Sequence, residues 1–378
     1  MIPESMLSAY GHPGIRWAAA HMPLLHETMA RDGGVFAGLR IGMCLHIEPK
    51  TAVLASLLVG HGARVRLTGS PGTTKPDVAA ALTGAGVEVT AADGAPHVDE
   101  VLALEPDLLL DNGADLTLGL LRNPPADFLG GTEETTTGGL RLREGGHSKV
   151  PFPVVVINDS PLKQLVENRF GVGQSVVQGF MNATNRMLPG ADAVVVGYGP
   201  CGRGVAQTLR LLGARVAVAE VDAYRRLEAL LEGHVTGDLV DLLPGADLVF
   251  LATGRTGVLG PDEIGQLRDG TVLAGVGHRG DEVDLRLLGE AGPVSGMHHR
   301  VHLLADGRRV VVLAETQMIN LVAAGGNPIE AMDLGLTLQA ASLAAVARGG
   351  LAPGVQPVPD TIDRDIAERF TAALTPAR

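Results

Sequence analysis

The sequence predicts an α/β protein, and three features of the chain carry this prediction. Short apolar runs alternate with helical patterns, and Gly and Pro separate them at the spacing typical of βα units. One apolar run, residues 193–196, leads directly into the pattern Gly197-x-Gly199-x-x-Gly202. An amphipathic stretch follows, and a second apolar run ends at Glu220. A strand, a glycine loop, a helix and a second strand in this order predict a Rossmann-type domain.

The glycine loop and Glu220 also predict which ligand this domain binds. The first glycine permits a tight turn, the second lets the backbone approach a pyrophosphate, and the third lets the helix pack closely against its strand. An acid about twenty residues further on accepts hydrogen bonds from the ribose hydroxyls of the adenosine half. Because the Glu220 carboxylate would repel a ribose phosphate, NAD is favoured over NADP, although Arg225 weakens that preference. The alternative is a glycine turn in an ordinary βαβ unit.

The composition is that of a globular protein. The 378 residues suit two or three domains, and the formal net charge of −12 disfavours nucleic acid and anionic membranes as partners. Two cysteines, Cys44 and Cys201, indicate a reducing compartment. Neither a secretory signal pattern nor an apolar run of membrane-spanning length is seen, so we expect a cytoplasmic protein. His298, His299 and His302 lack the carboxylate or cysteine pattern of a metal site, and we expect no metal.

The stretch before the glycine loop is typical of a parallel-sheet domain. Two of its predicted strands end in polar residues, one at His46 and the other at Asp111-Asn112. Ligands of open α/β sheets bind at the carboxyl ends of the strands, so we expect these residues to line a cleft. The predicted strands cover residues 40–47, 63–69, 87–90 and 106–113, and the predicted helices cover residues 51–58 and 77–82.

Residues 131–139 have the sequence GTEETTTGG, which is rich in threonine and glycine. Such a composition is unfavourable for a helix, so we expect a loop here. This loop would carry two adjacent carboxylates, Glu133 and Glu134.

The next segment predicts a strand, a cap and a helix. The sequence Asn158-Asp159-Ser160 is typical of a helix N-cap. On the helix that follows, Lys163 and Glu167 are four residues apart and therefore share one face. A plain helix salt bridge is the alternative to a functional pair.

After Glu220 the βα pattern repeats and then ends in a long apolar helix. Predicted strands cover residues 247–254, 271–278 and 307–315, and predicted helices cover residues 174–187, 224–232, 261–267 and 328–348. We expect the last of these helices to return to the first domain, and residues 349–378 to form a short tail. The predicted fold is an α/β substrate-binding domain (1–165) with an inserted Rossmann-type NAD-binding domain (166–325), followed by the returning helix and tail (326–378).

Several strings, taken in order, resemble the S-adenosylhomocysteine hydrolase (adenosylhomocysteinase) family. They lie between about Met22 and Arg348 and read HIEPKTAVL, DNGADLT, TEETTTGG, NDSPLKQLVEN, GYGPCGRG, VGHRGDEVD and DGRRVVVLAE, the last followed by Asn320. The resemblance implies tightly bound NAD and a homo-oligomer, a dimer or a tetramer. It also implies a reaction in which the 3′-hydroxyl of a nucleoside ribose is oxidised, homocysteine leaves C5′, water adds, and the ketone is reduced again. Convergence on an NAD-binding fold is the alternative.

The resemblance assigns roles to individual residues. Lys163 would take the proton of the oxidised hydroxyl, since a lysine in a closed site can act as a base. His46 and His278 would serve the chemistry at C5′, although a lone histidine at a strand end is more often structural. The catalytic candidates are His46, Asp111, Asn112, Glu134, Lys163, Glu167 and His278. The cofactor-binding candidates are Thr135, Thr136, Thr137, Asn168, Gly197, Gly199, Pro200, Cys201, Gly202, Glu220, Val221, Arg225, Thr253, Gly254, Gly277, His278 and Asn320. The substrate-binding candidates are Glu48, Lys50 and Asn327.

One departure from the family pattern affects the chemistry. Asn112 stands where the family has the aspartate thought to take the C4′ proton. An amide cannot act as a base. Asp111 could replace it only after local rearrangement, because neighbouring residues of a strand point to opposite faces.

Other departures affect recognition of the substrate and the cofactor. Glu48 and Lys50 stand where the family usually has a threonine and a polar or acidic residue that contact adenine. The family's C-terminal lysine and tyrosine, which reach a neighbouring subunit's NAD, are absent from a sequence that stops at Arg378. Further changed positions are Asn327 in place of a histidine, Gln317 in place of an arginine, and residues 69–77 near the homocysteine site.

These observations leave three hypotheses about function. The first is an adenosylhomocysteinase-like, NAD-dependent enzyme that transiently oxidises a nucleoside-like substrate with an altered base, so that elimination, hydration or epimerisation can follow at C4′ and C5′. The second is an authentic S-adenosylhomocysteine hydrolase that uses Asp111 as its base. The third is a catalytically weak, NAD-binding regulatory homologue. The first is favoured because the oxidation residues match the family pattern while the recognition positions do not.

Overall fold

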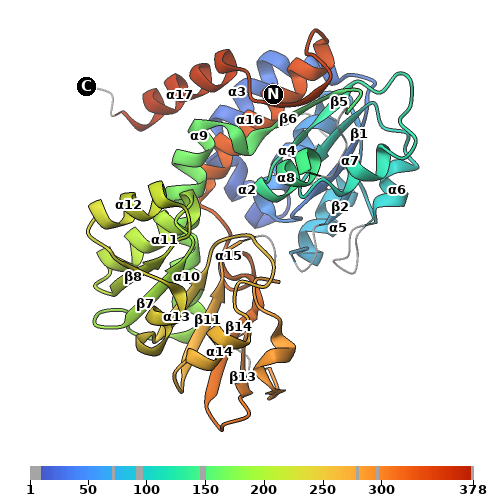
Figure 1. Cartoon of the computed structure of the whole chain (residues 1–378). Helices are drawn as coiled ribbons and strands as arrows, with labels where there is room; N and C mark the ends of the chain where they lie inside the picture. The colour runs from blue at the N-terminus through green and yellow to red at the C-terminus, as the bar shows by residue number, and fades with distance from the viewer. Residues whose placement is uncertain are drawn as a thin grey trace. The chain divides into compact units, whose positions relative to one another are not determined.

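The computed structural model describes residues 10–69, 73–90, 97–144, 150–277, 281–294 and 298–375. The chain divides into two compact units, one formed by Met1–Gln164 with Ile329–Arg378 and the other by Leu165–Pro328 (Figure 1). The second unit is therefore an insertion in the chain of the first. Both units combine helices with a central sheet, which confirms the predicted α/β class.

The first unit is built on a sheet with the strand order β15-β6-β5-β4-β1-β2-β3. All the paired strands of this sheet run parallel within the described residues. The central strands β4 and β5 are buried along their whole length, as expected for a parallel sheet with helices on both faces. The strands are β1 (Arg40–Leu45), β2 (Arg64–Gly69), β3 (Glu88–Val89), β4 (Leu108–Asp111), β5 (Gly130–Glu133), β6 (Pro153–Val156) and β15 (Gly354–Pro357).

The helix α16 (Ile329–Arg348) lies in the core of the first unit, against β4, β5 and α3 (Pro23–Asp32). By length and composition alone it could cross a membrane, but 83% of its most apolar window is buried inside the unit, as expected of a core helix. Its Asp333 accepts hydrogen bonds from the Leu24 and Leu25 backbone N–H groups at the start of α3. The other helices are α2 (Pro13–Ala20), α4 (Pro49–Gly60), α5 (Pro76–Gly84), α6 (Val98–Leu102), α7 (Asp115–Leu120), α8 (Thr136–Glu144), α9 (Pro161–Lys163) and α17 (Asp360–Leu374).

The prediction of a loop at residues 131–139 is wrong. The segment begins as strand β5 and continues, after Glu134 and Thr135, as helix α8. The helix can start among threonines and glycines because the Thr135 hydroxyl accepts the Gly138 N–H at 2.9 Å, and the Glu133 carboxylate accepts the Thr135 N–H at 2.7 Å. These side chains therefore supply acceptors for backbone N–H groups at the helix start, which helix propensity does not take into account.

The prediction of a short C-terminal tail is also wrong. Residues 354–357 form β15, which pairs in parallel with β6 and extends the sheet. The next residues form the helix α17, which packs against α16 and α3. Its Ile366 is fully buried, and the Arg369 guanidinium donates to the Thr28 hydroxyl at 2.7 Å. The prolines that suggested a tail lie outside the body of α17.

The second unit is built on a sheet with the strand order β12-β13-β14-β11-β10-β7-β8-β9. The strands from β14 to β9 are parallel, whereas β13 and β12 add an antiparallel edge. The strands are β7 (Asp192–Val196), β8 (Arg215–Ala219), β9 (Val235–Gly237), β10 (Leu248–Leu251), β11 (Thr271–Gly275), β12 (Glu290–Ala291), β13 (His299–Leu303) and β14 (Arg309–Met318). The helices are α10 (Val172–Thr184), α11 (Pro200–Leu211), α12 (Ala223–Leu231), α13 (Leu239–Leu242), α14 (Pro261–Gln266) and α15 (Ile319–Val322).

The central strands of the second unit are buried on both faces of the sheet. In β7, Val195 lies in one apolar cluster with Val205 and Leu209 of α11. Its neighbours Val194 and Val196 lie in the cluster on the other face of the sheet. This alternation follows from the two-residue period of a strand, and it fixes the carboxyl end of β7 at the glycine loop.

Candidate active site

The glycine loop has the geometry that a bound dinucleotide requires. Gly197 has a φ of +93°, in the left-handed region that favours glycine. A Cβ at Gly202 would lie 2.0 Å from the Gly197 carbonyl oxygen, so only glycine fits where the helix approaches the loop. A Cβ at Gly199 would meet only the Arg225 guanidinium, at 3.6 Å. The loop therefore leaves space at the N-terminus of α11, which begins at Pro200, and this is where a pyrophosphate binds in such loops.

Glu220 ties the glycine loop to the end of the neighbouring strand β8. Its carboxylate accepts the Tyr198 N–H at 2.6 Å and the Asp222 N–H at 2.8 Å. A carboxylate offers about four lone-pair sites, so it can accept ribose hydroxyls in addition to these two bonds. Val221, next to it, is fully exposed.

Thr253 and Gly254 follow β10, the strand next to β7, and both donate hydrogen bonds to Glu282. The buried Glu282 carboxylate accepts the Thr253 hydroxyl at 2.6 Å and both backbone N–H groups at 3.1 Å. Burial raises the pKa of the Glu282 carboxyl. Glu282 was not among the predicted residues, although it lies in the VGHRGDEVD string. Gly277 lies close to this carboxylate, and the predicted His278 lies outside the described residues.

Four polar residues of the second unit form a connected group. Asn327 donates to the Glu167 carboxylate at 3.4 Å, and its side-chain oxygen accepts from Ser175 at 2.9 Å and from Asn320 at 3.1 Å. The group comes from the π-helix Gln164–Gly171, which also carries the buried Asn168, and from α10 and α15. The group links three predicted residues of different kinds. Glu167 is a catalytic candidate, Asn320 a cofactor-binding candidate and Asn327 a substrate-binding candidate. Ser175 was not predicted.

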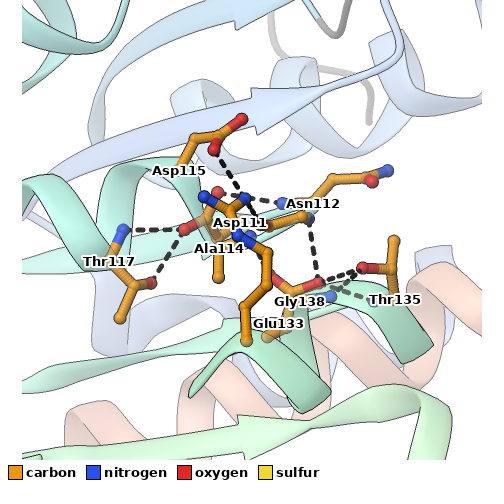
Figure 2. Close-up of polar contacts among 10 residues, drawn as sticks. Asp111, Asn112, Ala114, Asp115, Thr117, Glu133, Thr135 and Gly138 are labelled. Atoms are coloured by element: carbon orange, nitrogen blue, oxygen red, sulfur yellow. Dashed lines mark hydrogen bonds and ion pairs between the residues drawn. The ribbon is translucent and has the colours of Figure 1, made fainter. Parts of the chain in front are cut away.

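In the first unit, Asp111 and Glu133 form a buried polar group on one side of the sheet (Figure 2). They lie opposite each other in register on β4 and β5, and both are fully buried. Glu133 accepts four hydrogen bonds, from the Gly113, Ala114 and Thr135 N–H groups and from the Thr135 hydroxyl, at 2.6–3.0 Å. Asp111 accepts the Thr117 N–H and hydroxyl at 2.7 and 2.8 Å. Burial raises the pKa of both carboxyls.

This arrangement does not support Asp111 as a catalytic base. Both of its oxygens are engaged, one by Thr117 and one by the Asn112 N–H at 3.0 Å, and the side chain has no exposed surface. It anchors the start of α7, just as Glu133 anchors the start of α8. The two adjacent glutamates of the TEETTTGG string therefore have different surroundings.

The residues that follow, Asn112 and Glu134, form a second buried group with Lys163. The Lys163 side-chain nitrogen lies 3.4 Å from one Glu134 oxygen, and the Asn112 amide nitrogen lies 3.5 Å from the other. All three side chains are less than a tenth exposed, and the Asn112 side-chain oxygen has no hydrogen-bond partner among the described residues. A buried amine, a carboxylate and an amide oxygen free to accept are together suited to bind sugar hydroxyls and to move a proton.

The segment that carries Lys163 starts abruptly. Ser160 is the N-cap of α9, and its hydroxyl accepts the Lys163 N–H at 3.0 Å, as the predicted cap requires. After Lys163 the helix continues as the π-helix Gln164–Gly171. Single π-turns are rare in helices and occur frequently at functional sites.

The remaining predicted residues lie near the starts of α4, α8 and α11. The His46 ring lies 2.6 Å from the Thr73 hydroxyl. Glu48 and Lys50 form a buried ion pair at 2.9 Å, and Glu48 also caps α4 through Thr51. Thr136 accepts the Asn158 amide at 2.6 Å, and Thr137 and Cys201 are partly buried in the first turns of α8 and α11. Within the described ranges, no His, Cys, Asp and Glu residues are grouped to hold a metal ion.

Two substitutions in the glycine loop are expected to fail in different ways. Gly202→Ala should destabilise the fold, since its Cβ would overlap the Gly197 carbonyl oxygen. Gly199→Ala should leave the unfolding midpoint unchanged but lower NAD affinity at least about tenfold, because the methyl group occupies the approach of the pyrophosphate. Thermal unfolding and calorimetric NAD titration of both variants measure the two effects. Wild-type NAD affinity in Gly199→Ala would contradict the assigned cofactor position.

Comparison with known proteins identifies the family of this chain. The family model described as S-adenosyl-L-homocysteine hydrolase matches residues 1–127, and that for the NAD-binding domain of the same enzyme matches residues 168–326. The chain is 40% identical to S-inosyl-L-homocysteine hydrolase of Methanopyrus kandleri, over 97% of this chain and 91% of that protein. It is 39% identical to adenosylhomocysteinase of Sulfurisphaera tokodaii, over 97% of this chain and 92% of that protein. The chain therefore belongs to the S-adenosyl-L-homocysteine hydrolase family and is an NAD-dependent enzyme.

Proposed function

We propose that the chain hydrolyses an S-nucleosylhomocysteine by transient oxidation of the ribose 3′-hydroxyl. We also propose that the nucleobase of this substrate is a 6-oxopurine rather than adenine. The buried group of Lys163, Glu134 and Asn112 is the observation that supports the oxidation chemistry. The ion pair of Glu48 and Lys50 supports the altered base. The overall reaction consumes one water and yields a nucleoside and homocysteine, with no net oxidation.

In this proposal Lys163, as a neutral amine, takes the proton from the 3′-hydroxyl oxygen. NAD, held at the glycine loop and Glu220, would supply a reversible acceptor for the hydride of C3′. The 3′-ketone acidifies the C4′ proton, and loss of that proton expels the homocysteine thiolate from C5′. Water then adds at C5′, C4′ is protonated again, and Lys163 returns its proton as the ketone is reduced.

The C4′ proton needs an acceptor other than Asn112, because an amide is not a base. We assign this role to Glu134, the carboxylate that Asn112 contacts at 3.5 Å. The side-chain oxygen of Asn112 then accepts a sugar hydroxyl, which gives this buried atom a partner. His46, at the end of β1, is assigned to protonate the leaving thiolate.

The base preference follows from the chemistry of an ion pair. Lysine can only donate hydrogen bonds and an ionised glutamate can only accept them. A 6-oxopurine offers an acceptor at O6 and a donor at N1, which Lys50 and Glu48 complement. Adenine offers a donor at the 6-position and an acceptor at N1, so the same pair opposes it. An unpaired buried polar group costs about 1–3 kcal/mol, or about 5- to 200-fold in rate. The name of the Methanopyrus kandleri relative describes a hypoxanthine nucleoside as its substrate.

Thiol release from S-inosylhomocysteine and from S-adenosylhomocysteine tests this proposal. We expect kcat/KM for the inosyl substrate to be at least about tenfold higher. The double variant Glu48→Thr, Lys50→Glu restores the residue types usual in the family and should reverse the preference. If the wild type prefers the adenosyl substrate and the double variant does not change that preference, the proposed 6-oxopurine specificity is wrong. If neither thioether releases thiol although NAD is bound, the hydrolase function itself is wrong.

A further inference from the structure

The C-terminal helix α17 reaches the residue that caps the Lys163 segment. The Ser160 hydroxyl donates to the Asp363 carboxylate, in the first turn of α17. The same hydroxyl oxygen accepts the Lys163 N–H at 3.0 Å. Ser160 is 1% exposed, so water does not compete for these bonds. A chain of two hydrogen bonds thus connects α17 to the backbone of Lys163.

The direction of these bonds matters, because a hydroxyl has one proton. When that proton is donated to Asp363, the lone pairs of Ser160 are left to accept from Lys163. Without the carboxylate, the hydroxyl is free to rotate and to donate to a nearby carbonyl group, and the cap weakens. N-caps typically contribute about 1 kcal/mol to a helix start.

Lys163 lies in the first turn of its helical segment, and the cap bonds its own backbone N–H. The α-helical part, Pro161–Lys163, is three residues long and turns directly into the π-helix. The α17 side of the connection is firm, since Ile366 is fully buried and Arg369 bonds Thr28. A fixed carboxylate on a packed helix therefore holds the cap at the start of the segment that carries Lys163.

We propose that Asp363 is a positioning residue for Lys163, so that the C-terminal helix is part of the machinery for the oxidation step. This inference depends on the proposed function, in which Lys163 takes the proton of the ribose hydroxyl. The amine must lie within hydrogen-bond distance of that oxygen, and a displacement of about 1 Å can lower a rate about 10²-fold. The substrate does not contact Asp363 in this proposal, so KM depends little on it.

Stopped-flow measurement of reduced nicotinamide on mixing NAD-loaded enzyme with S-inosylhomocysteine tests the proposal. Asp363→Ala should slow the appearance of the reduced form, and lower kcat, at least about tenfold, with KM and NAD content near wild type. Asp363→Asn retains an oxygen that accepts from Ser160 and should recover most of the rate. Asp360→Asn, at the exposed start of α17, is the matched control and should behave as wild type.

A double-mutant cycle with Ser160→Ala supplies an independent readout. Because both residues act through one connection, the double variant should be no slower than Ser160→Ala alone. A purely structural role predicts a lower unfolding temperature with an unchanged oxidation rate per folded enzyme, and that result would overturn the proposal. Lys163→Ala distinguishes failure of the proposed function from failure of the positioning role. If it keeps the oxidation step, the proposed function fails, whereas if it loses the step and Asp363→Ala and Ser160→Ala keep it, only the positioning role fails.

Discussion

Lys163→Ala is expected to lower turnover by about 10²–10⁴-fold while NAD remains bound. Lys163 is 3% exposed and its amine lies 3.4 Å from Glu134, so we expect no solvent base to replace it at the ribose hydroxyl. The loss should appear in the oxidation step, before any thiol leaves. Stopped-flow absorbance of reduced nicotinamide and thiol release, measured on the same samples, give both rates.

Arg64→Ala is the control for this experiment. Arg64 is an exposed basic residue of the same unit that pairs with Glu88 at the start of β2, whereas the proposed site lies at the carboxyl ends of the strands. Its loss should leave both rates within about twofold of wild type, in line with the small effects of substitutions away from functional groups. Normal oxidation by Lys163→Ala would show that another group takes the proton.

Glu133→Ala is expected to destabilise the protein by at least about 3 kcal/mol. The substitution leaves three backbone N–H groups and the Thr135 hydroxyl without their acceptor, in a place with no exposed surface. Its neighbour Glu134 is expected to show the opposite pattern. Glu134→Gln should abolish turnover but cost less stability than Glu133→Ala, because the amide keeps an oxygen near Lys163 and anchors no helix start.

Urea unfolding followed by tryptophan fluorescence, together with thiol release, measures this contrast. The pair is its own control, since the two positions have the same residue type and are adjacent in the chain. A stable, inactive Glu133→Ala variant with an active, unstable Glu134→Gln variant would reverse the assignment of the two carboxylates.

Most of the fold could be predicted from the sequence, because it depends on local patterns. The apolar runs before Gly197 and Asp111 form the central strands β7 and β4, and the glycine spacing predicts the loop between β7 and α11. The errors arose where side-chain contacts or a distant strand supply what composition does not reveal. Helix α8 begins among threonines because the Thr135 hydroxyl accepts the Gly138 N–H and the nearby Glu133 carboxylate accepts the Thr135 N–H. Strand β15 forms because β6 offers an unpaired edge, and no local pattern of residues 354–357 reveals that edge.

Only part of the site could be predicted from the sequence. Strand alternation indicates that Asp111 and Asn112 point to opposite faces, and the same rule separates Glu133 from Glu134. The roles of Glu282, Ser175 and Asp363 could not be predicted, since each depends on contacts between segments far apart in the chain. The helical pattern of Ile362, Ile366 and Phe370 was a usable signal for α17, and the flanking prolines concealed it.

The central claim is that a ribose 3′-hydroxyl is oxidised before the thioether is cleaved. Rapid mixing of the NAD-loaded enzyme with S-inosylhomocysteine, and separately with its 3′-deoxy analogue, tests it most directly. The account predicts that the absorbance of reduced nicotinamide rises before thiol appears, and that the 3′-deoxy compound gives neither signal. Thiol release from the 3′-deoxy analogue, or from the natural thioether without any reduced nicotinamide, would contradict the account.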